Sequence, residues 1–194
     1  MTPSSPGRLF PVIARVPDRY HPLVGRTKVQ TLSRLAREAL KRSCRISGLR
    51  LDKLPKNPKG APLPVNGVYW SLTHKSEAVG AVAAPFPVGL DLEMVHPVNS
   101  TMMAKVANDG EWKLVEGDRL KNFFRLWTAK EAVLKAVGHG IVGLSRCRVV
   151  DVVDDALMVL EYDGVSWPVE SFWRNDLVAA ATPCDFLVQW TLAT

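Results

Sequence analysis

The pattern of apolar positions predicts two long helices of different character. In residues 28–47 apolar side chains recur every three or four positions, with Thr27 placed to cap the start and Gly48 to close the end in the left-handed conformation. Residues 121–137 also follow a helical pattern and end at a glycine, Gly138, but apolar side chains occupy most of the circumference. We therefore expect the first helix to lie on the surface and the second to be largely buried.

Strands are predicted on both sides of the buried helix by apolar runs that lie between turn residues. The expected strands cover residues 9–16, 68–73, 79–84, 88–94, 147–153, 157–162, 165–173, 177–181 and 186–192, and short helices are expected at 99–108 and 111–115. Strand, helix and strands are thus followed by helices and more strands. This order predicts an α+β fold with two halves, residues 1–95 and 96–194.

Two charged residues stand out on the apolar helix. Glu131 and Lys135 lie one turn apart, on the stripe that also holds Phe124 and Thr128. A charge on a buried helix needs a partner or a ligand, because burying it alone is costly. The alternative is an ordinary helix ion pair, with Glu four residues before Lys, worth roughly 0.3–0.5 kcal/mol. The helix alone does not decide between a ligand site and this pair.

Two carboxylates share one face of the strand predicted over residues 88–94. Side chains alternate along a strand, so Asp91 and Glu93 point the same way, opposite to Leu90 and Leu92. They are close enough to bind one cation together, and Mg²⁺ is commonly bound by one or two carboxylates combined with substrate phosphates. The alternative is the solvent-exposed face of an amphipathic strand.

Positive charge is concentrated at the beginning of the chain. The 194 residues carry a net charge of +6, but residues 1–60 hold 14 of the 25 Lys and Arg against three acids, which gives this part +11 and the remainder −5. The imbalance indicates an anionic partner, such as an acidic protein, a multiply phosphorylated small molecule or a nucleic acid. Few aromatic residues for base stacking and no nucleic-acid motif argue against the last of these. A basic surface that only aids solubility is the alternative.

A stiff loop is predicted over residues 52–67, because four prolines forbid regular structure there. The same loop carries Lys53, Lys56 and Lys59. It therefore either lines a ligand pocket with its lysines or only connects the first helix to the next strand.

The sequence indicates a cytoplasmic protein without a membrane partner. Its apolar runs are too short to cross a bilayer, and residues 1–7 lack the pattern of a signal peptide. Cys44, Cys147 and Cys184 are odd in number and far apart, without the spacing of metal ligands. We therefore expect reduced, mostly structural cysteines.

Read in chain order, the acidic strand and the buried helix resemble the paired signature of the 4′-phosphopantetheinyl transferases. Residues 88–93 match the family's strand, in which Gly and an apolar residue precede Asp and a further acid. Forty residues lead from Asp91 to Glu131, which agrees with the family's spacing. The segment 127–135 matches the helix motif, with Trp, a small residue, Lys, Glu and Ala followed by a Lys four positions after the Glu.

Three further segments resemble the same family. Residues 71–74 look like its Ser-His segment, with Thr73 where Ser is usual. Residues 59–62 resemble its Gly, basic, Pro loop, although Ala61 stands at the basic position. Residues 138–140 match the Gly-x-Gly that follows the helix. The chain length is similar to that of the monomeric, two-lobed surfactin-type branch.

The resemblance implies both a fold and a reaction. The fold would consist of two similar halves related by a pseudo-twofold axis, each a small antiparallel sheet packed against a long helix, with the active site between them. The reaction would move the 4′-phosphopantetheine arm of coenzyme A to a serine of an apo acyl or peptidyl carrier protein and release adenosine 3′,5′-bisphosphate. The implied partners are coenzyme A and an acidic carrier protein, without nucleic acid, and the chain would act as a monomer.

The resemblance also assigns a metal site and catalytic groups. Asp91, Glu93 and Glu131 would hold Mg²⁺, or Mn²⁺ in its place, against the pyrophosphate of coenzyme A. Lys135 would meet a phosphate oxygen. Glu131 is the first choice to take the proton of the carrier serine, directly or through water, and Asp91 is the second.

Contacts to coenzyme A follow by matching position. His74 would touch the 3′-phosphate, helped by Thr73 and by an arginine of the first helix, either Arg34 or Arg37. Lys59 would substitute for the basic residue that the loop lacks at its usual position.

Two other charged residues have open interpretations. Lys130 matches the helix motif, but its stripe is apolar, so it could equally be a structural lysine that extends its ammonium group to the surface. Glu111 resembles a family acid that helps to order the site, or it only starts a helix before Trp112.

Two other functions remain as alternatives. Another metal-dependent phosphotransferase could use the same three carboxylates on a different nucleotide-like substrate. A non-catalytic binding protein for an acidic partner would use them only structurally. The residues do not specify whether the carrier protein serves fatty acid, polyketide or nonribosomal peptide synthesis.

Overall fold

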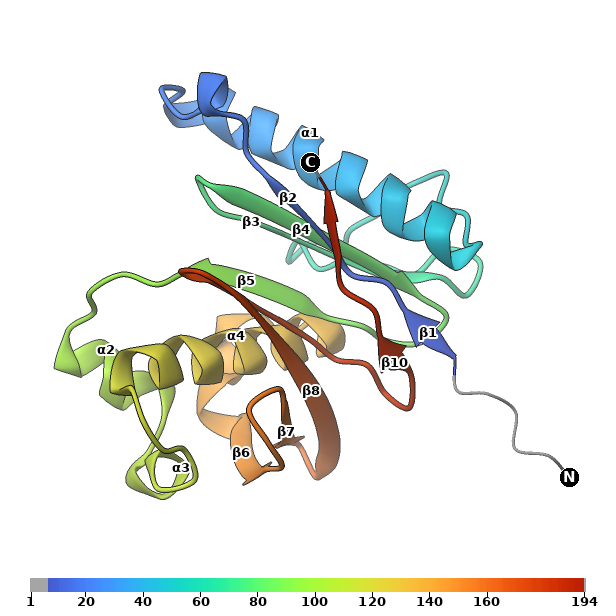
Figure 1. Ribbon diagram of the computed structural model, residues 1–194. Helices are drawn as coiled ribbons and strands as arrows, with labels where there is room; N and C mark the ends of the chain where they lie inside the picture. The colour runs from blue at the N-terminus through green and yellow to red at the C-terminus, as the bar shows by residue number, and fades with distance from the viewer. Residues whose placement is uncertain (1–6, 194) are drawn as a thin grey trace, which may run out of the picture.

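Two large β-sheets, each covered on its outer face by one long helix, and a third sheet of two short strands make up the computed structural model, which describes residues 7–193 (Figure 1). Helix α1 (Gly25–Ser47) lies on the first sheet, and α4 (Arg119–Val137) lies on the second. Apolar side chains from the inner faces of the two sheets pack together. The layers therefore follow the order helix, sheet, sheet, helix, and the predicted α+β class is confirmed.

The first sheet has the strand order β11-β2-β4-β3. Its members are β2 (Val12–Arg15), β3 (Tyr69–His74), β4 (Ala78–Ala84) and β11 (Thr191–Ala193). The strands β2, β4 and β3 pair antiparallel, whereas β11 joins β2 in parallel. Ala39 and Leu40 of α1 pack against Trp70 and Val12 of this sheet. The sheet predicted to be antiparallel thus carries one parallel edge strand.

The second sheet is antiparallel throughout, with the order β5-β9-β8-β7-β6. Its members are β5 (Leu90–Met94), β6 (Arg148–Val152), β7 (Leu157–Tyr162), β8 (Val165–Arg174) and β9 (Leu177–Ala181). The short helices α2 (Ser100–Val106) and α3 (Asp109–Trp112) lead from β5 to α4. Two 3₁₀ turns, Asp18–Tyr20 and Ile141–Arg146, precede α1 and follow α4, and neither was predicted.

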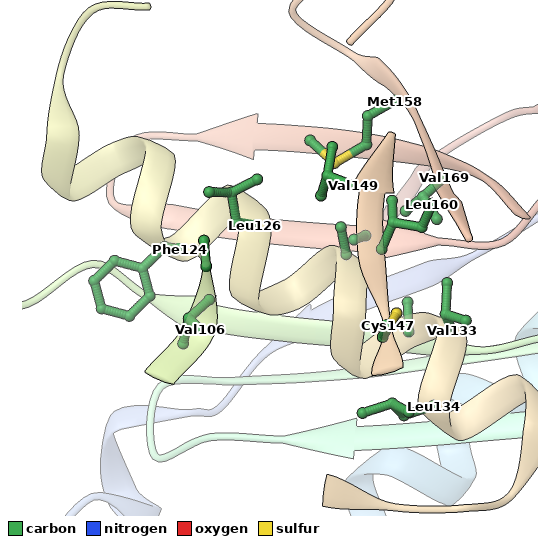
Figure 2. Close-up of a cluster of buried hydrophobic side chains, with 14 of the residues drawn as sticks. Val106, Phe124, Leu126, Val133, Leu134, Cys147, Val149, Met158, Leu160 and Val169 are labelled. Carbon is green, nitrogen blue, oxygen red and sulfur yellow. The ribbon is translucent and has the colours of Figure 1, made fainter. Parts of the chain in front are cut away.

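Helix α4 is buried, as its apolar circumference predicts. Asp118 caps its start by accepting hydrogen bonds from the backbone N–H groups of Leu120 and Lys121 at 2.8 and 3.0 Å. Gly138 ends it in the left-handed conformation, with φ +72°. Between these caps the helix contributes side chains such as Leu126 to the largest apolar cluster of the second half, part of which is shown in Figure 2.

Strand β5 is enclosed on both faces. Leu90 and Leu92 point toward the first sheet, where they approach Gly80 of β4. On the other face the backbone runs against α4 so closely that a Cβ at Gly89 would lie 1.8 Å from the carbonyl oxygen of Ala132. The carboxylates of β5 share the face of Gly89, so α4 covers them. The interpretation of this face as solvent-exposed is therefore wrong.

Some boundaries differ from the prediction. Helix α1 begins at Gly25, so Thr27 lies inside the first turn and does not cap the helix. The strand predicted at 9–16 is divided at Pro11, which has no backbone N–H to donate, into β1 (Arg8–Leu9) and β2. The strand predicted at 186–192 is divided in the same way, because β10 (Leu187–Val188) pairs with β1 and β11 pairs with β2.

The two sheets do not follow the predicted boundary at residue 95. Strand β5 lies before this boundary but pairs with β9 in the second sheet, and β10 and β11 return to β1 and β2. The order β2-β4-β3 in the first sheet recurs as β5-β9-β8 in the second. In sequence, α1 lies between β2 and β3, and α4 lies between β5 and β8. This recurrence is compatible with a pseudo-twofold relation, and the division into residues 1–95 and 96–194 stays a prediction.

The described residues bear on two further predictions, which concern membrane-spanning helices and the state of the cysteines. Within residues 7–193, no helix is both long and apolar enough to cross a membrane. Residues 1–6, on which the signal-peptide prediction rests, lie outside the described range. The three cysteines fall inside it and are free thiols, with Cys44 and Cys147 buried and Cys184 exposed.

Candidate active site

A cleft of about 350 Å³ opens where the edge strands of the two sheets, β3 and β5, meet α4. It is lined by Leu72, Thr73, His74, Lys75, Asp91, Glu93, Trp127, Glu131, Lys135 and Ile141. The structure thus brings together every predicted metal ligand and catalytic residue, and also Thr73 and His74. Residues from three separate segments meet here because β3 and β5 are neighbouring edges and α4 covers β5.

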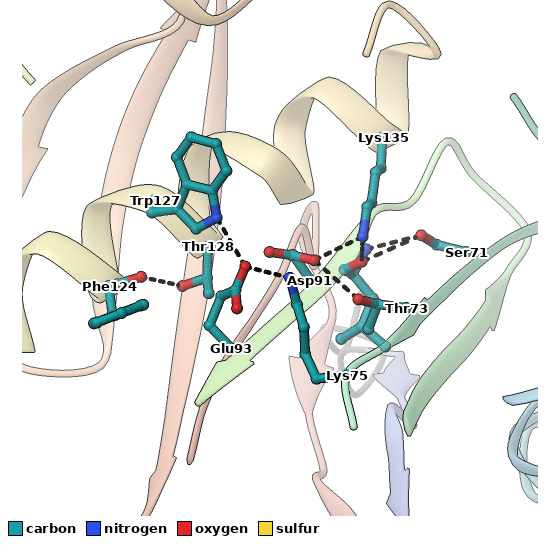
Figure 3. Close-up of polar contacts among 10 residues, drawn as sticks. Ser71, Thr73, Lys75, Asp91, Glu93, Phe124, Trp127, Thr128 and Lys135 are labelled. Carbon is teal, nitrogen blue, oxygen red and sulfur yellow. Dashed lines mark hydrogen bonds and ion pairs between the residues drawn. The ribbon is translucent and has the colours of Figure 1, made fainter. Parts of the chain in front are cut away.

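Asp91 is the centre of one polar cluster (Figure 3). It is buried on β5, and its Oδ1 accepts hydrogen bonds from Lys135 Nζ at 2.7 Å and from Thr73 Oγ1 at 2.9 Å. Lys135 Nζ also donates to the backbone carbonyl of Leu90 at 3.2 Å. Lys135 therefore pairs with the strand rather than with Glu131, and the interpretation as an ordinary helix ion pair is wrong.

Glu93 is the centre of a second cluster beside the first. Its Oε1 accepts from Lys75 Nζ at 2.5 Å and from Trp127 Nε1 at 3.0 Å (Figure 3). Lys75 is the lysine of the cleft that the sequence did not predict, because it lies between the strands expected at 68–73 and 79–84. Strand β3 runs on through His74, so the next residue stands at the strand end, opposite β5. A lysine two positions after the strand predicted at 68–73 was the available signal.

Glu131 faces the same cleft and forms no ion pair with any residue from 7 to 193. Its Oε1 is buried and has no hydrogen-bond partner in the part of the chain that the structure describes, and the same holds for Asp91 Oδ2. Burial raises the pKa of Glu131, and the nearby Asp91 charge raises it further, although Lys135 opposes the shift. Three carboxylates thus face two ammonium groups, so the fully ionised cleft carries one excess negative charge.

The cleft suits a hard divalent cation in its chemistry. No three His, Cys, Asp or Glu side chains among residues 7–193 are grouped closely enough to hold a metal ion. However, Asp91 and Glu131 each direct a buried, unpartnered oxygen into a negatively charged cleft, and Glu93 lies next to them. Carboxylate oxygens are the ligands that Mg²⁺ and Mn²⁺ prefer. The donor set fits such an ion, since Asp91 and Glu131 each keep one oxygen unpartnered within residues 7–193, while Glu93 is bound by Lys75.

His74 lies at the mouth of the cleft, at the end of β3. Partial burial lowers the pKa of its imidazole, and the ammonium groups of Lys135 and Lys75 lower it further. Lys56 of the proline-rich loop adds a smaller effect of the same sign. The imidazole is therefore neutral at pH 7, and the surrounding positive charge favours an anion beside it.

Three of the residues expected to bind coenzyme A lie outside this cleft. Arg34 donates to Glu38 at 2.6 Å and to the hydroxyl of Tyr20 at 3.2 Å, so its guanidinium is engaged on α1 itself. Arg37 is exposed on the same helix, and Lys59 is exposed in the loop. The structure does not bring these side chains to the cleft, and their phosphate contacts stay predictions.

Lys130 and Glu111 form a buried ion pair away from the cleft. Lys130 Nζ lies 2.6 Å from Glu111 Oε1, and the two side chains are only 3% and 6% exposed. Glu111 also accepts from the backbone N–H groups of Asn108 at 3.0 Å and Val149 at 2.8 Å. Glu111 thus belongs to a capping box at the start of α3 and also ties α3 to α4 and β6, while a role in ordering the site stays a prediction. Lys130 does not reach the surface.

This ion pair gives a prediction about stability. Replacing Lys130 by Met leaves the charge of Glu111 buried without its ammonium partner, which should destabilise the fold by about 3–5 kcal/mol. The double variant Lys130→Met/Glu111→Gln removes both charges and should recover most of that loss. Urea unfolding at pH 7 measures both values. A double variant as unstable as the single one would mean that the pair is not the cause.

A family model and several known proteins that match this chain all carry the same description. The family model described as the 4′-phosphopantetheinyl transferase superfamily matches residues 87–182. The 4′-phosphopantetheinyl transferase gsp of Aneurinibacillus migulanus is 27% identical over 90 residues, which are 44% of this chain and 38% of that relative. The 4′-phosphopantetheinyl transferase HetI of Nostoc sp. is 32% identical over 91 residues, 43% of this chain and 38% of the relative.

A third relative matches a shorter stretch. The putative 4′-phosphopantetheinyl transferase of Haemophilus influenzae is 42% identical over 64 residues, 31% of this chain and 27% of the relative. The chain thus spans less than half the length of each of these relatives. The region matched by the family model includes β5, α4 and six of the cleft residues: Asp91, Glu93, Trp127, Glu131, Lys135 and Ile141.

Proposed function

The chain belongs to the 4′-phosphopantetheinyl transferase superfamily, and from this we propose that it transfers the phosphopantetheine arm of coenzyme A to a serine of an apo carrier protein. The convergence of three carboxylates and Lys135 in one cleft is the observation that carries the proposal. The second product would be adenosine 3′,5′-bisphosphate. The attacked atom is a phosphorus of a pyrophosphate, so the site must neutralise charge and position a hydroxyl group.

We further propose Mg²⁺ as the ion of this site, held by Asp91, Glu93 and Glu131. The unpartnered oxygens of Asp91 and Glu131 support this, because a buried carboxylate oxygen without a donor is costly unless a cation meets it. The bound ion would supply a Lewis acid that draws charge from the pyrophosphate. Mn²⁺ has the same preference for oxygen ligands.

Glu131 is our first candidate for the group that takes the serine proton. Its pKa is raised by burial, which makes it a stronger base than an ordinary glutamate. Asp91 is the second candidate. One of its oxygens already accepts hydrogen bonds from Lys135 and Thr73, whereas Glu131 has an unpartnered oxygen among the described residues.

Lys135 would donate to a phosphate oxygen of coenzyme A. Its side chain is 27% exposed, and its ammonium lies at the cleft wall beside Asp91, so it can turn toward a bound anion. We propose that His74 and Thr73 contact the 3′-phosphate of coenzyme A. Arg34 or Arg37 and Lys59 would have to move to assist them.

Replacing Lys135 by Ala is expected to raise the KM for coenzyme A by about tenfold or more, because a charge-assisted hydrogen bond contributes roughly 1.5–3 kcal/mol. Steady-state kinetics at saturating carrier protein measures the change. Lys121→Ala is the matched control, because it removes a lysine from the exposed start of the same helix. A KM equal to that of the control would remove Lys135 from the phosphate site.

The carrier protein would approach the basic face of the chain. The exposed side of α1 carries Arg37, Lys41, Arg42 and Arg45, within the segment that holds a net charge of +11. We propose that this face attracts the acidic surface of a carrier protein and that the chain acts on it as a monomer. The association should then weaken as salt is added.

Product analysis tests the proposed reaction. With coenzyme A, Mg²⁺ and an apo carrier protein, the chain should release adenosine 3′,5′-bisphosphate, and it should release none when the acceptor serine is replaced by Ala. Release that is independent of the carrier serine would favour a phosphotransferase acting on another acceptor. No release, together with binding of the carrier protein, would favour the non-catalytic binding protein.

A further inference from the structure

Lys75 binds one of the three carboxylates that would hold a metal ion. Its Nζ lies 2.5 Å from Glu93 Oε1, and the indole N–H of Trp127 donates to the same oxygen. Asp91 and Glu131, by contrast, each keep one oxygen without a partner within residues 7–193. Asp91 is paired with Lys135 through its other oxygen, Glu131 has no printed ion pair among the described residues, and Glu93 is the acid that Lys75 binds.

The two lysines of the cleft differ in how they are held. Lys135 comes from α4, donates to Asp91 and also to the backbone of β5, and is 27% exposed. Lys75 is 37% exposed, and Glu93 is its only ion-pair partner in the described part of the chain. An ammonium on a flexible stem with one partner can leave it at a low cost. The pair between Lys75 and Glu93 is thus the displaceable one.

We propose that Lys75 is an internal competitor of the divalent cation for Glu93, and so weakens metal binding at this cleft. The inference rests on the proposed function for the identity of the ion as the one used in transfer. An ammonium group cannot serve as a ligand to a metal, and its charge repels one. A cation held by Glu93 together with Asp91 and Glu131 would therefore be repelled by Lys75 until that side chain has moved away.

The competition has a direct consequence for affinity. The free energy of breaking the pair between Lys75 and Glu93 is subtracted from the free energy of metal binding. Removing Lys75 frees Glu93 in advance and also removes one positive charge from the cleft. The freed carboxylate would then strengthen binding only if it is itself a ligand, which a second substitution at Glu93 can show.

Binding of Mn²⁺ alone to the purified full chain tests this inference, with the free ion followed by electron paramagnetic resonance. Lys75→Met should bind Mn²⁺ about fivefold more tightly than the natural chain, or more, since even a partly exposed ion pair is worth up to roughly 1 kcal/mol. Lys75→Met/Glu93→Gln should lose this gain. Thermal unfolding without metal shows whether each variant is folded. If Lys75→Met does not fold, Lys75→Gln is used in its place.

Lys56→Met is the matched control for charge. Its ammonium is close enough to influence His74 but does not line the cleft. It should change the affinity for Mn²⁺ by less than about twofold. The inference is overturned if Lys75→Met binds no more tightly than Lys56→Met, or if the double variant keeps the gain.

The outcome stands apart from the test of the proposed function, because neither coenzyme A nor carrier protein is present. A natural chain that releases no adenosine 3′,5′-bisphosphate would contradict the proposed function and leave the Mn²⁺ result valid. A natural chain that transfers the arm, combined with unchanged Mn²⁺ affinity in Lys75→Met, would contradict this inference alone.

Discussion

Glu131→Gln is expected to abolish phosphopantetheine transfer and, in the absence of metal, to make the fold more stable at neutral pH. The carboxylate is placed in a buried position where one oxygen has no partner among residues 7–193. Its charged form is disfavoured by burial and by the charge of Asp91. Glutamine keeps the shape without the charge, so the variant loses the proposed base and metal ligand together with their cost to the fold.

The dependence on pH follows from the direction of this shift. The pKa of Glu131 in the folded chain lies above its ordinary value of 4.5. The folded state therefore holds the proton more tightly than the unfolded state, and the resulting stability is present below pH 4.5 and lost as the pH rises through the raised pKa. Glu131→Gln has no such loss. Its advantage over the natural chain should appear above pH 4.5 and grow until the raised pKa has been passed.

Thermal unfolding from pH 4 to pH 8 with a chelator measures this difference. The expected result is two similar melting temperatures at pH 4 and a higher one for Glu131→Gln at pH 8. Added Mg²⁺ should reverse the order, because only the natural chain would bind it through Glu131. A variant that is less stable by the same amount at every pH would show that Glu131 is a structural residue without electrostatic strain.

Gly89→Ala is expected to destabilise the fold by about 3 kcal/mol or more, and to lower transfer activity with it. A Cβ at this position would lie 1.8 Å from the carbonyl oxygen of Ala132, a backbone atom of α4 that cannot turn aside. Helix α4 would have to move away from β5. Because Asp91 stands on β5 and Glu131 on α4, the same movement widens the cleft.

Gly117→Ala is the control for this variant. A Cβ at Gly117 has nothing within 4 Å, and its φ of +90° limits the effect to backbone strain of about 1 kcal/mol. Urea unfolding compares the two variants. If Gly89→Ala unfolds at the same urea concentration as Gly117→Ala, the close approach of β5 and α4 does not determine the geometry of the cleft.

Sequence patterns predicted the parts of the site that depend on local order. The apolar circumference of α4 predicted its burial, and alternation along β5 placed Asp91 and Glu93 on one side. The pattern did not predict what covers that side, because coverage depends on how closely α4 approaches β5. The decisive residue was Gly89, whose missing side chain admits the helix. The sequence therefore left two interpretations of this side of β5, a solvent-exposed face or a cation-binding site, and the packing of α4 rules out the first.

The contacts of the lysines were beyond local patterns as well. Glu131 and Lys135 had the spacing of an ion pair, yet Lys135 pairs with Asp91, which lies 44 positions away in the sequence. Lys75 and Glu93 meet only because β3 and β5 are neighbouring edges of different sheets. The same limit applies to Arg34, where Glu38 on the same helix competes with any phosphate for the guanidinium.

The most direct test of the account is the intact mass of an apo carrier protein after incubation with this chain, coenzyme A and Mg²⁺. We expect the carrier mass to increase by one phosphopantetheine arm, and we expect no increase with a chelator or with Asp91→Asn, provided that this variant unfolds like the natural chain. Fatty acid, polyketide and peptide carrier proteins serve as parallel substrates. An unchanged mass for all three, from a folded chain that binds coenzyme A, would contradict the assignment of this cleft as a phosphopantetheinyl transferase site.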